Sequence, residues 1–507
     1  MNASISVLPE PKILFGDNRP MSDPHAGLSL FGPYDKSDCS HPETINYAVI
    51  GTERGIELFA AFARLIQRPV FHESFAKPFS SLELERLWPP FPGFSAAFES
   101  KFPSATRFSY SIPRSEIEKH VNDRDQHKRV FQIANLYLDK LRLIAERDES
   151  IKVAICIEPD IIWSNCRPLS TIKGDATGMK VSAKEAAERR RYGGDLFELL
   201  PDGQYDYSVD FRRQIKARAM EYGIPIQLIR ESTLVVSPAK GEREVTSISD
   251  RAWNISTALY YKAGGKPWKL ADAREGVCYI GLAFKQSETC KRNKNNACCA
   301  AQMFLDSGDG VVFRGEFGPW YSEKSREFHL SKDAAKSLLE GVLHTYAEQE
   351  GKPLKEVFLH SRSGFSNEEL EGYRQACGDN IKLVGIRVGQ GYRELRLFRK
   401  GEWCVQRGSL WIQDDRTAYL WASGFKTDLL TYDGWEVPAP IQIYIQHGDA
   451  DINLVSRDIF ALTKLNYNTC KIGDSLPVTV AFSDKVGEIL ISNPTVKKRC
   501  PNFKFYI

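Results

Sequence analysis

The feature that most constrains the fold is an alternation of apolar strands with amphipathic helices in the first half of the chain. The segment "IKVAICIEP", residues 151–159, is apolar along almost its whole length, as strands buried on both faces of a parallel sheet are. Stretches with helical periodicity lie between such runs. The expected elements are a strand at 45–51, a helix at 53–67, a helix at 129–147, a strand at 151–159, a helix at 211–223 and a strand at 224–230. This order predicts an open α/β sheet.

After Leu270 the pattern changes to strands in succession, one long helix and a further strand. We expect consecutive antiparallel strands at 276–285 and in "GDGVVFRGEFG", around a turn at "DSGDG". A capped helix is expected at 331–351, and a strand and turn in "KEVFLHSRSGF". This order indicates a ribonuclease-H-like α/β layer. The predicted division is therefore residues 1–270 and residues 271–507.

Composition limits the class of protein without identifying it. The 507 residues include 11 cysteines, an odd number without framework spacing, which is typical of a reduced, cytoplasmic protein. No apolar stretch approaches the ~20 residues of a membrane span. The net charge of +3 permits nucleic acid as a partner if the basic residues gather on one face. The cysteines of "CKRNKNNACC" (Cys290, Cys298 and Cys299) lack the fourth ligand of a structural zinc site.

Four polar residues before Leu270 form a candidate phosphate site. Arg212 and Lys216 are four positions apart, which places them one turn apart on one face of the expected helix. The next strand carries Gln227, and Lys262 precedes the glycine pair of "YYKAGGKPWKL". Fixed cations and a neutral donor suit a terminal phosphate, at ~1.5–3 kcal/mol for each charge-assisted contact. Without Gln227 and Lys262, the pair Arg212 and Lys216 would indicate only an exposed helix face.

The glycine pair has two interpretations. Gly264 and Gly265 could let the backbone approach a ligand closely, because glycine has no side chain. They could also form a simple turn, with Trp268 filling a core.

In this order, Arg212, Lys216, Gln227 and Lys262 resemble the MID domain of Argonaute proteins. In that family an aromatic, His or Arg residue four before a Lys, then a Gln, then a Lys before Gly-Gly hold the 5′-phosphate of a guide strand. The segments "LFGP", "RESTL" and "LTKLNYN" are also similar, so the resemblance covers essentially the whole chain. It implies a Rossmann-like MID domain followed by an RNase H-like PIWI domain, as in short prokaryotic Argonautes without N and PAZ domains.

The resemblance also implies ligands and a partner. Family members can use a divalent cation and the C-terminal carboxylate at the guide phosphates, which here implies Mg²⁺ at Ile507. The implied guide is RNA, and the implied target is complementary single-stranded DNA. The pattern is that of Argonautes that pair with a separate TIR-APAZ protein, as a heterodimer that oligomerises on target binding. A Sir2-APAZ or nuclease-APAZ partner is the alternative.

An active PIWI domain cuts with clustered carboxylates that bind two Mg²⁺ ions about 3.5–4 Å apart. At the family's first acid position, after "CYIG", this chain has Ala283, and at the second, in "SRSG", it has Ser363. The third position keeps an acid, Asp484, which also fits a helix N-terminus. Because one acid cannot hold two metals, we expect a pseudo-nuclease that binds the guide–target duplex without cutting it.

Three classes of function remain open at this point. The leading expectation is guide-RNA-directed recognition of single-stranded DNA, which activates an NAD-consuming TIR-APAZ partner in abortive defence against plasmids or phage. The second is an active guide-directed nuclease with acids elsewhere, although Asp306, Asp309 and the pair Asp414-Asp415 fit hairpin turns better. The third is a nucleotide-dependent metabolic enzyme, but "GTERG" after the first strand does not match GxGxxG.

Overall fold

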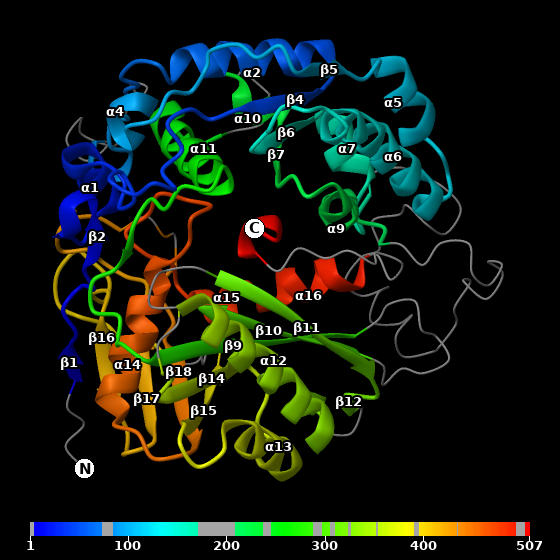
Figure 1. Ribbon diagram of the computed structural model, residues 1–507. Helices are drawn as coiled ribbons and strands as arrows, with labels where there is room; N and C mark the ends of the chain where they lie inside the picture. Colours follow the sequence, from blue (N-terminus) through cyan, green and yellow to red (C-terminus); the bar gives the residue numbers. More distant parts are fainter. Residues whose placement is uncertain are drawn as a thin grey trace.

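The computed structural model has two lobes, each built on its own main sheet (Figure 1). It describes residues 5–72, 85–170, 208–236, 245–286, 297–304, 310–322, 326–350, 353–389, 395–432, 434, 436–492 and 502–507. The first lobe contains a four-stranded sheet and the second a nine-stranded sheet. The last residues, 502–507, lie between the lobes (Figure 1).

The sheet of the first lobe is parallel throughout, in the order β5-β4-β6-β7. Its strands are β5 (Ser109–Ser111), β4 (Tyr47–Gly51), β6 (Val153–Glu158) and β7 (Ile226–Arg230). Along β6, Val153 and Ile155 join one apolar core, while Ala154 and Cys156 join another on the opposite face. Both faces are buried, as the continuous apolar run predicts, and the expected open α/β sheet is confirmed.

Helices cover both faces of this sheet. The core on one face includes side chains of α2 and α11, and the core on the other includes side chains of α5, α6 and α9. The helices of this lobe are α2 (Glu53–Leu65), α4 (Phe94–Phe98), α5 (Arg114–Val121), α6 (Gln126–Ala145), α7 (Asp160–Asn165), α9 (Phe211–Ala219), α10 (Glu231–Leu234) and α11 (Ile248–Lys262). The helix expected at 211–223 is α9 plus a 3-10 turn, Met220–Tyr222, and it ends at Gly223 with φ of 69°.

A small sheet joins the lobes, in the order β3-β2-β8. Its strands are β3 (Arg19–Met21), β2 (Ile13–Phe15) and β8 (Lys269–Leu270), and α1 (Pro24–Phe31) follows β3. β8 follows the "YYKAGGKPW" segment, so the end of α11 is tied to the N-terminal residues. The indole of Trp268 is fully buried there and donates to the carbonyl of Lys464 at 3.0 Å.

The sheet of the second lobe is mixed, in the order β1-β16-β17-β18-β15-β14-β9-β10-β11. Among the described strands, β9, β14 and β15 pair in parallel, as in an RNase H-like layer, and the other pairs are antiparallel. Its strands are β1 (Ile5–Val7), β16 (Ser409–Ile412), β17 (Thr417–Trp421), β18 (Ile441–His447), β15 (Lys382–Gly389), β14 (Glu356–Ser361), β9 (Val277–Gln286), β10 (Ala297–Phe304) and β11 (Gly310–Gly318). A short hairpin, β12 (Tyr321–Ser322) with β13 (Glu327–Phe328), follows.

One pairing in this sheet differs from the sequence expectation, and another involves a strand that the sequence did not predict. β9 and β11 are not neighbours, because β10 lies between them and pairs with both, for example Ala301 with Leu282 and with Phe313. The expectation of two consecutive strands was wrong, because the alanine-rich run "ACCAAQMF" forms a strand of its own. β1, in the segment assigned to residues 1–270, extends the far edge of the large sheet through β16.

Helices cover this sheet on both faces. α12 (Lys332–Glu350), where a helix was expected at 331–351, packs with α13 (Asn367–Cys377) on one face. The other face carries α14 (Ile452–Ala461), α15 (Val478–Ala481) and α16 (Ser483–Ile491). α16 faces α9 of the first lobe across the junction (Figure 1).

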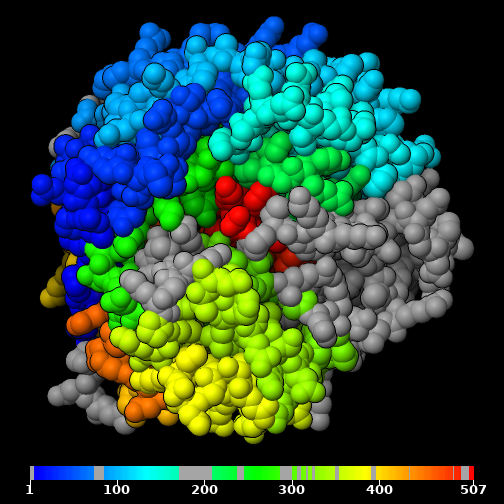
Figure 2. All heavy atoms as spheres, viewed as in Figure 1, coloured from blue at the N-terminus to red at the C-terminus, as the bar shows by residue number. Residues whose placement is uncertain are grey.

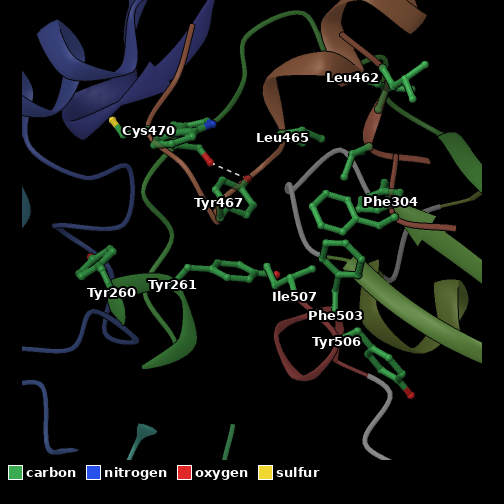
Figure 3. Close-up of a cluster of buried hydrophobic side chains, with 14 of the residues drawn as sticks. Tyr260, Tyr261, Phe304, Leu462, Leu465, Tyr467, Cys470, Phe503, Tyr506 and Ile507 are labelled. Atoms are coloured by element: carbon green, nitrogen blue, oxygen red, sulfur yellow. Dashed lines mark hydrogen bonds between the residues drawn. The ribbon is translucent and has the colours of Figure 1, made fainter. Parts of the chain in front are cut away.

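Aromatic side chains fill the junction between the lobes (Figure 3). Tyr261 of α11 stacks on Tyr467 with ring centroids 4.5 Å apart, and the Tyr467 hydroxyl donates to the carbonyl of Trp268 at 2.9 Å. Phe503, in the 3-10 turn Phe503–Phe505, packs edge-on against Phe304 of β10 at 5.2 Å. This packing fixes the last residues beside α11, where the candidate site lies.

Candidate nucleic-acid interface

A pocket of about 450 Å³ lies where α9, β7 and α11 meet α16 and the last residues of the chain. All five residues predicted to hold a guide phosphate line it: Arg212, Lys216, Gln227, Lys262 and Ile507. In Figure 2 the C-terminal residues, in red, are visible from outside between the two lobes. The structure therefore brings together residues that are up to 295 positions apart (507 − 212 = 295).

Helix α9 presents two of the cations. The carboxylate of Asp210 caps the helix by accepting a backbone N–H of the first turn at 3.1 Å. Phe211 and Ile215 are buried in the core that α9 shares with α5 and α6 on one face of the sheet. Because Arg212 and Lys216 lie on a different face from these residues, they point to the pocket, as the four-residue spacing predicts.

Lys216 is half-buried among other cations. Its Nζ donates to the main-chain oxygen of Tyr506 at 3.4 Å. Burial, and then the charges of Arg212 and Lys485, lower the pKa of Lys216 to about 7. The amine thus lies in a place where an anion would stabilise its charged form.

Lys262, the last residue of α11, is 1% exposed. Its Nζ donates to the main-chain oxygens of Ile226 at 2.8 Å and Ile507 at 2.6 Å. Burial, followed by the charges of Lys216 and Arg212, holds its pKa well below the usual value. Within the described residues, neither Lys262 nor Lys216 bonds to a side-chain carboxylate.

Gln227 supplies the neutral polar group at the wall of the pocket. It lies in β7, and its Nε2 donates to the carbonyl of Leu228 at 3.3 Å. Its Oε1 is buried and has no hydrogen-bond partner among the described parts of the chain. Because a buried polar atom without a partner costs free energy, this amide is available to a ligand.

Two neighbouring side chains fix the orientation of Arg212. Its Nε contacts the carboxylate of Glu158 at 3.3 Å, and its guanidinium lies 5.0 Å from the ring centre of Trp163 in α7. Glu158 is 1% exposed, and burial raises its pKa while Arg212 lowers it. One carboxylate and one ring therefore orient the guanidinium.

The glycine pair makes a turn and does not line the pocket. Gly264 has φ of 108°, and Gly265 packs so closely on the ring of Tyr260 that a Cβ there would lie 2.3 Å from Cε1. The hydroxyl of Tyr260 donates to the buried Asp35 at 2.5 Å. The idea that these glycines bring backbone to the ligand was wrong, and the simple turn, with Trp268 in the core, is confirmed.

The structure adds pocket residues that sequence reasoning missed. Lys485, Glu488 and Asn468 line the pocket from the second lobe, and Arg213 lines it from α9. Lys485 directly follows Asp484, the acid that the sequence suggested as a degenerate catalytic position. Arg213 could have been predicted, because it is adjacent to Arg212 in "DFRRQIK".

The expected Mg²⁺ at Ile507 was tested against the donors in the pocket. Gln227 Oε1 and the main-chain oxygen of Ile507 are of the type that Mg²⁺ prefers. However, Lys262 already donates to that oxygen of Ile507, and Arg212, Lys216 and Lys485 line the same pocket. Since a divalent cation would be repelled by these charges, the donor set does not fit a metal held by the protein alone.

The first two PIWI acid positions lie in neighbouring parts of the large sheet. Ala283 is a buried residue of β9, and Ser363 follows β14, which pairs in parallel with β9. Asp484 is the second residue of α16, so its expected place at a helix N-terminus is confirmed. Its side chain lies outside the described part of the structure.

The structure describes some of the other acids and cysteines that the sequence offered as candidate sites. Asp414 and Asp415 lie in the hairpin between β16 and β17, as expected. Asp306, Asp309, Cys290 and the side chains of Cys298 and Cys299 lie outside the described residues. In the part of the chain that is described, no group of three or more His, Cys, Asp or Glu side chains is placed to hold a metal. No helix in these ranges is long and apolar enough to span a membrane.

Comparison with solved structures identifies the fold. The model is similar to Clostridium butyricum Argonaute bound to a guide DNA and a 19-mer target DNA, with a TM-score of 0.61, 16% identity and coverage of 100% of this chain and 55% of that one. It is also similar to A. aeolicus Argonaute, with a TM-score of 0.56, 14% identity and coverage of 100% and 56%. A structure of Aa-Ago with externally bound siRNA gives a TM-score of 0.56, 15% identity and coverage of 99% and 56%.

These similarities show an Argonaute-like fold, and the expected MID and PIWI architecture is confirmed. The chain spans about 55% of the length of the Clostridium butyricum Argonaute. No protein-family model matches the sequence, and no curated protein matches it.

Proposed function

We propose that the pocket binds the 5′-phosphate of a guide RNA and that the protein uses the guide to recognise complementary single-stranded DNA. The observation that carries this proposal is the pair Lys216 and Lys262. Both amines converge on one pocket, and burial, followed by the charges of neighbouring cations, lowers both pKa values. In the described chain neither amine bonds to a side-chain carboxylate, and the oxygen of the last residue, Ile507, reaches only Lys262. A phosphate supplies the missing negative charge.

The pocket suits a terminal phosphate better than an internal one. Arg212, Lys216 and Lys262 all line the pocket, and Lys262 lies close enough to the other two to feel their charges. A phosphomonoester carries about −1.5 to −2 charges at neutral pH. Three charge-assisted contacts at ~1.5–3 kcal/mol each hold such a group firmly. The solved Clostridium butyricum relative carries a guide DNA and a target DNA, which supports a guide-binding role for this fold.

The PIWI lobe, in this proposal, recognises the guide–target duplex without cutting it. Ala283 and Ser363 stand where the chemistry needs carboxylates, and both belong to the described structure. Without carboxylates at these positions, two metal ions lack ligands, and the water that attacks the phosphodiester is not aligned with the leaving oxygen.

The effector, in this proposal, is a separate TIR-APAZ protein that consumes NAD when target DNA binds. This part rests on the sequence resemblance alone. Co-purification of the two proteins, with NAD consumption that requires a matched DNA target, is the measurement that checks it. NAD consumption that is indifferent to the target sequence would contradict it.

Target capture by the purified chain tests the proposed recognition. Loaded with a 5′-phosphorylated guide RNA, the protein should retain a complementary single-stranded DNA and release a scrambled one in a filter-binding assay. The retained DNA should remain full length for hours with Mg²⁺ or Mn²⁺, because the acid positions are incomplete.

Three outcomes would contradict parts of this account. Retention of both DNAs alike would exclude guide-directed recognition. If a 5′-phosphorylated DNA guide supported the same retention of complementary DNA as the RNA guide, the proposed preference for RNA would be wrong. A cut at a defined position that Asp484→Ala abolishes would show that the PIWI lobe is a nuclease.

A further inference from the structure

Glu488 lines the pocket from α16, which packs against α9 across the junction of the lobes. It lies in α16 of the second lobe and lines the same pocket as the phosphate-site residues. Its side chain is 19% exposed, so solvent and ligands reach it.

One oxygen of Glu488 is held by two cations from different elements. Oε1 lies 2.9 Å from Nη2 of Arg213 in α9 and 3.1 Å from Nζ of Lys285 in β9. An anionic oxygen shared by a guanidinium and an ammonium is also the arrangement that a phosphate oxygen adopts with protein cations.

The pocket therefore has two zones with different charge balance. In the inner zone, among the residues that the structure describes, Lys216 contacts a main-chain oxygen of Tyr506, and Lys262 contacts a main-chain oxygen of Ile226 and an oxygen of the last residue, Ile507, but neither contacts a side-chain carboxylate. In the outer zone, which Arg213 and Glu488 line, Glu488 pairs with Arg213 and with Lys285 of β9 beside the pocket, and Asp210 lies 4.0 Å from Arg213. A terminal phosphate enters the inner zone without displacing a side-chain carboxylate.

We propose that Glu488 holds the place of a backbone phosphate of the bound strand. This inference rests on the proposed function and deepens it. A 5′-phosphorylated mononucleotide fills the inner zone and leaves Glu488 in place. A longer strand continues along the junction, where a phosphodiester displaces Glu488 from Arg213 and Lys285. Glu488 thus lowers the affinity for strands and keeps the outer cations paired until a strand arrives.

The test compares two ligands on the Glu488→Gln variant of the full chain. This change keeps the shape of the side chain and removes its charge. The variant should bind a 5′-phosphorylated ten-nucleotide RNA about tenfold more tightly, since one competing charge-assisted contact is removed. The 5′-phosphorylated mononucleotide should change by less than about threefold, because a charge at the surface acts only modestly at longer range.

Salt dependence gives a second readout. In the wild type the phosphodiester replaces an ion pair that Glu488 already makes, whereas in Glu488→Gln no such pair is lost. The log–log salt slope for the ten-nucleotide RNA should therefore steepen by about 0.7 in the variant. The matched control is Glu371→Gln, because Glu371 lies on the exposed face of α13 and pairs with Lys332 and Arg374. This control should leave both affinities and the slope unchanged.

A companion variant keeps the idea testable if Glu488→Gln folds poorly. Lys285→Ala should weaken the ten-nucleotide RNA severalfold and leave the mononucleotide unchanged. Equal gains for both ligands in Glu488→Gln, or no loss for the strand in Lys285→Ala, would overturn the proposal. Loss of the proposed function itself would appear differently, as a wild-type protein that binds 5′-phosphorylated and 5′-hydroxyl RNA equally.

Discussion

At the scale of single residues, the site consists of cations that are costly in the free protein. Lys262 is fully buried and Lys216 half-buried, and burial disfavours the charged form of both. The spacing of Arg212 and Lys216 predicted their shared face, because helix geometry is local. Sequence could not place Lys485 or Glu488 in the pocket, because they approach α9 only through the docking of the two lobes.

This charge balance predicts how guide binding depends on pH. The pKa of Lys216 is lowered to about 7 by burial first and then by Arg212 and Lys485. A bound phosphate favours the charged amine and raises that pKa, so binding above pH 7 takes up a proton. Affinity for 5′-phosphorylated RNA should therefore fall between about pH 7 and pH 9, by up to about tenfold per pH unit for this lysine. Fluorescence anisotropy at constant ionic strength measures it.

The control is Lys216→Arg, because arginine stays charged over this range. Its affinity should decline less steeply than that of the wild type. Identical pH profiles for the two proteins would show that Lys216 does not titrate on binding.

At the scale of elements, the turn after α11 explains why a glycine pair follows Lys262. Gly264 adopts a φ of 108°, which residues with a side chain rarely adopt, and Gly265 leaves room for the Tyr260 ring. The turn lets Lys262 end the helix at the pocket while Trp268, six positions on, fills the core (268 − 262 = 6).

Gly265→Ala should destabilise the protein by about 1–3 kcal/mol, because its Cβ would lie 2.3 Å from the buried ring of Tyr260. The melting temperature, measured by thermal shift, should fall. Gly341→Ala is the matched control, since Gly341 lies in α12 with no atom within 4 Å of an added Cβ. It should keep or raise the melting temperature, because alanine favours a helix. An unchanged melting temperature in Gly265→Ala would contradict the tight turn.

Sequence predicted the helices α2, α6, α9 and α12 and three of the four strands of the parallel sheet, β4, β6 and β7, because their periodicity is local. It missed β10, where a run of alanines and cysteines has no alternation of polar and apolar residues. It also gave no sign that β1 pairs with β16, since the two strands are about 400 positions apart (409 − 5 = 404). Such pairings depend on the whole fold.

At the scale of the whole molecule, the candidate site exists only when both lobes are docked. The first lobe supplies Arg212, Lys216, Gln227 and Lys262, and the second lobe with the last residues supplies the opposite wall. Stacking of Tyr261 on Tyr467 and the bond from Tyr467 to Trp268 fix this arrangement. The order of the four residues along the sequence led to the proposed ligand, whereas the charge balance of the pocket became visible only in the structure.

The most direct test of the central claim is the ratio of affinities for 5′-phosphorylated and 5′-hydroxyl RNA of one sequence. The wild type should prefer the phosphorylated strand strongly. Lys216→Ala combined with Lys262→Ala should lose several kcal/mol for that strand, up to about twice the ~1.5–3 kcal/mol of one charged contact, and little for the hydroxyl strand. Lys332→Ala with Lys336→Ala, two half-exposed lysines of α12, is the matched control and should keep the ratio. Equal losses for both strands in the pocket variant would contradict the assignment of this pocket to the 5′-phosphate.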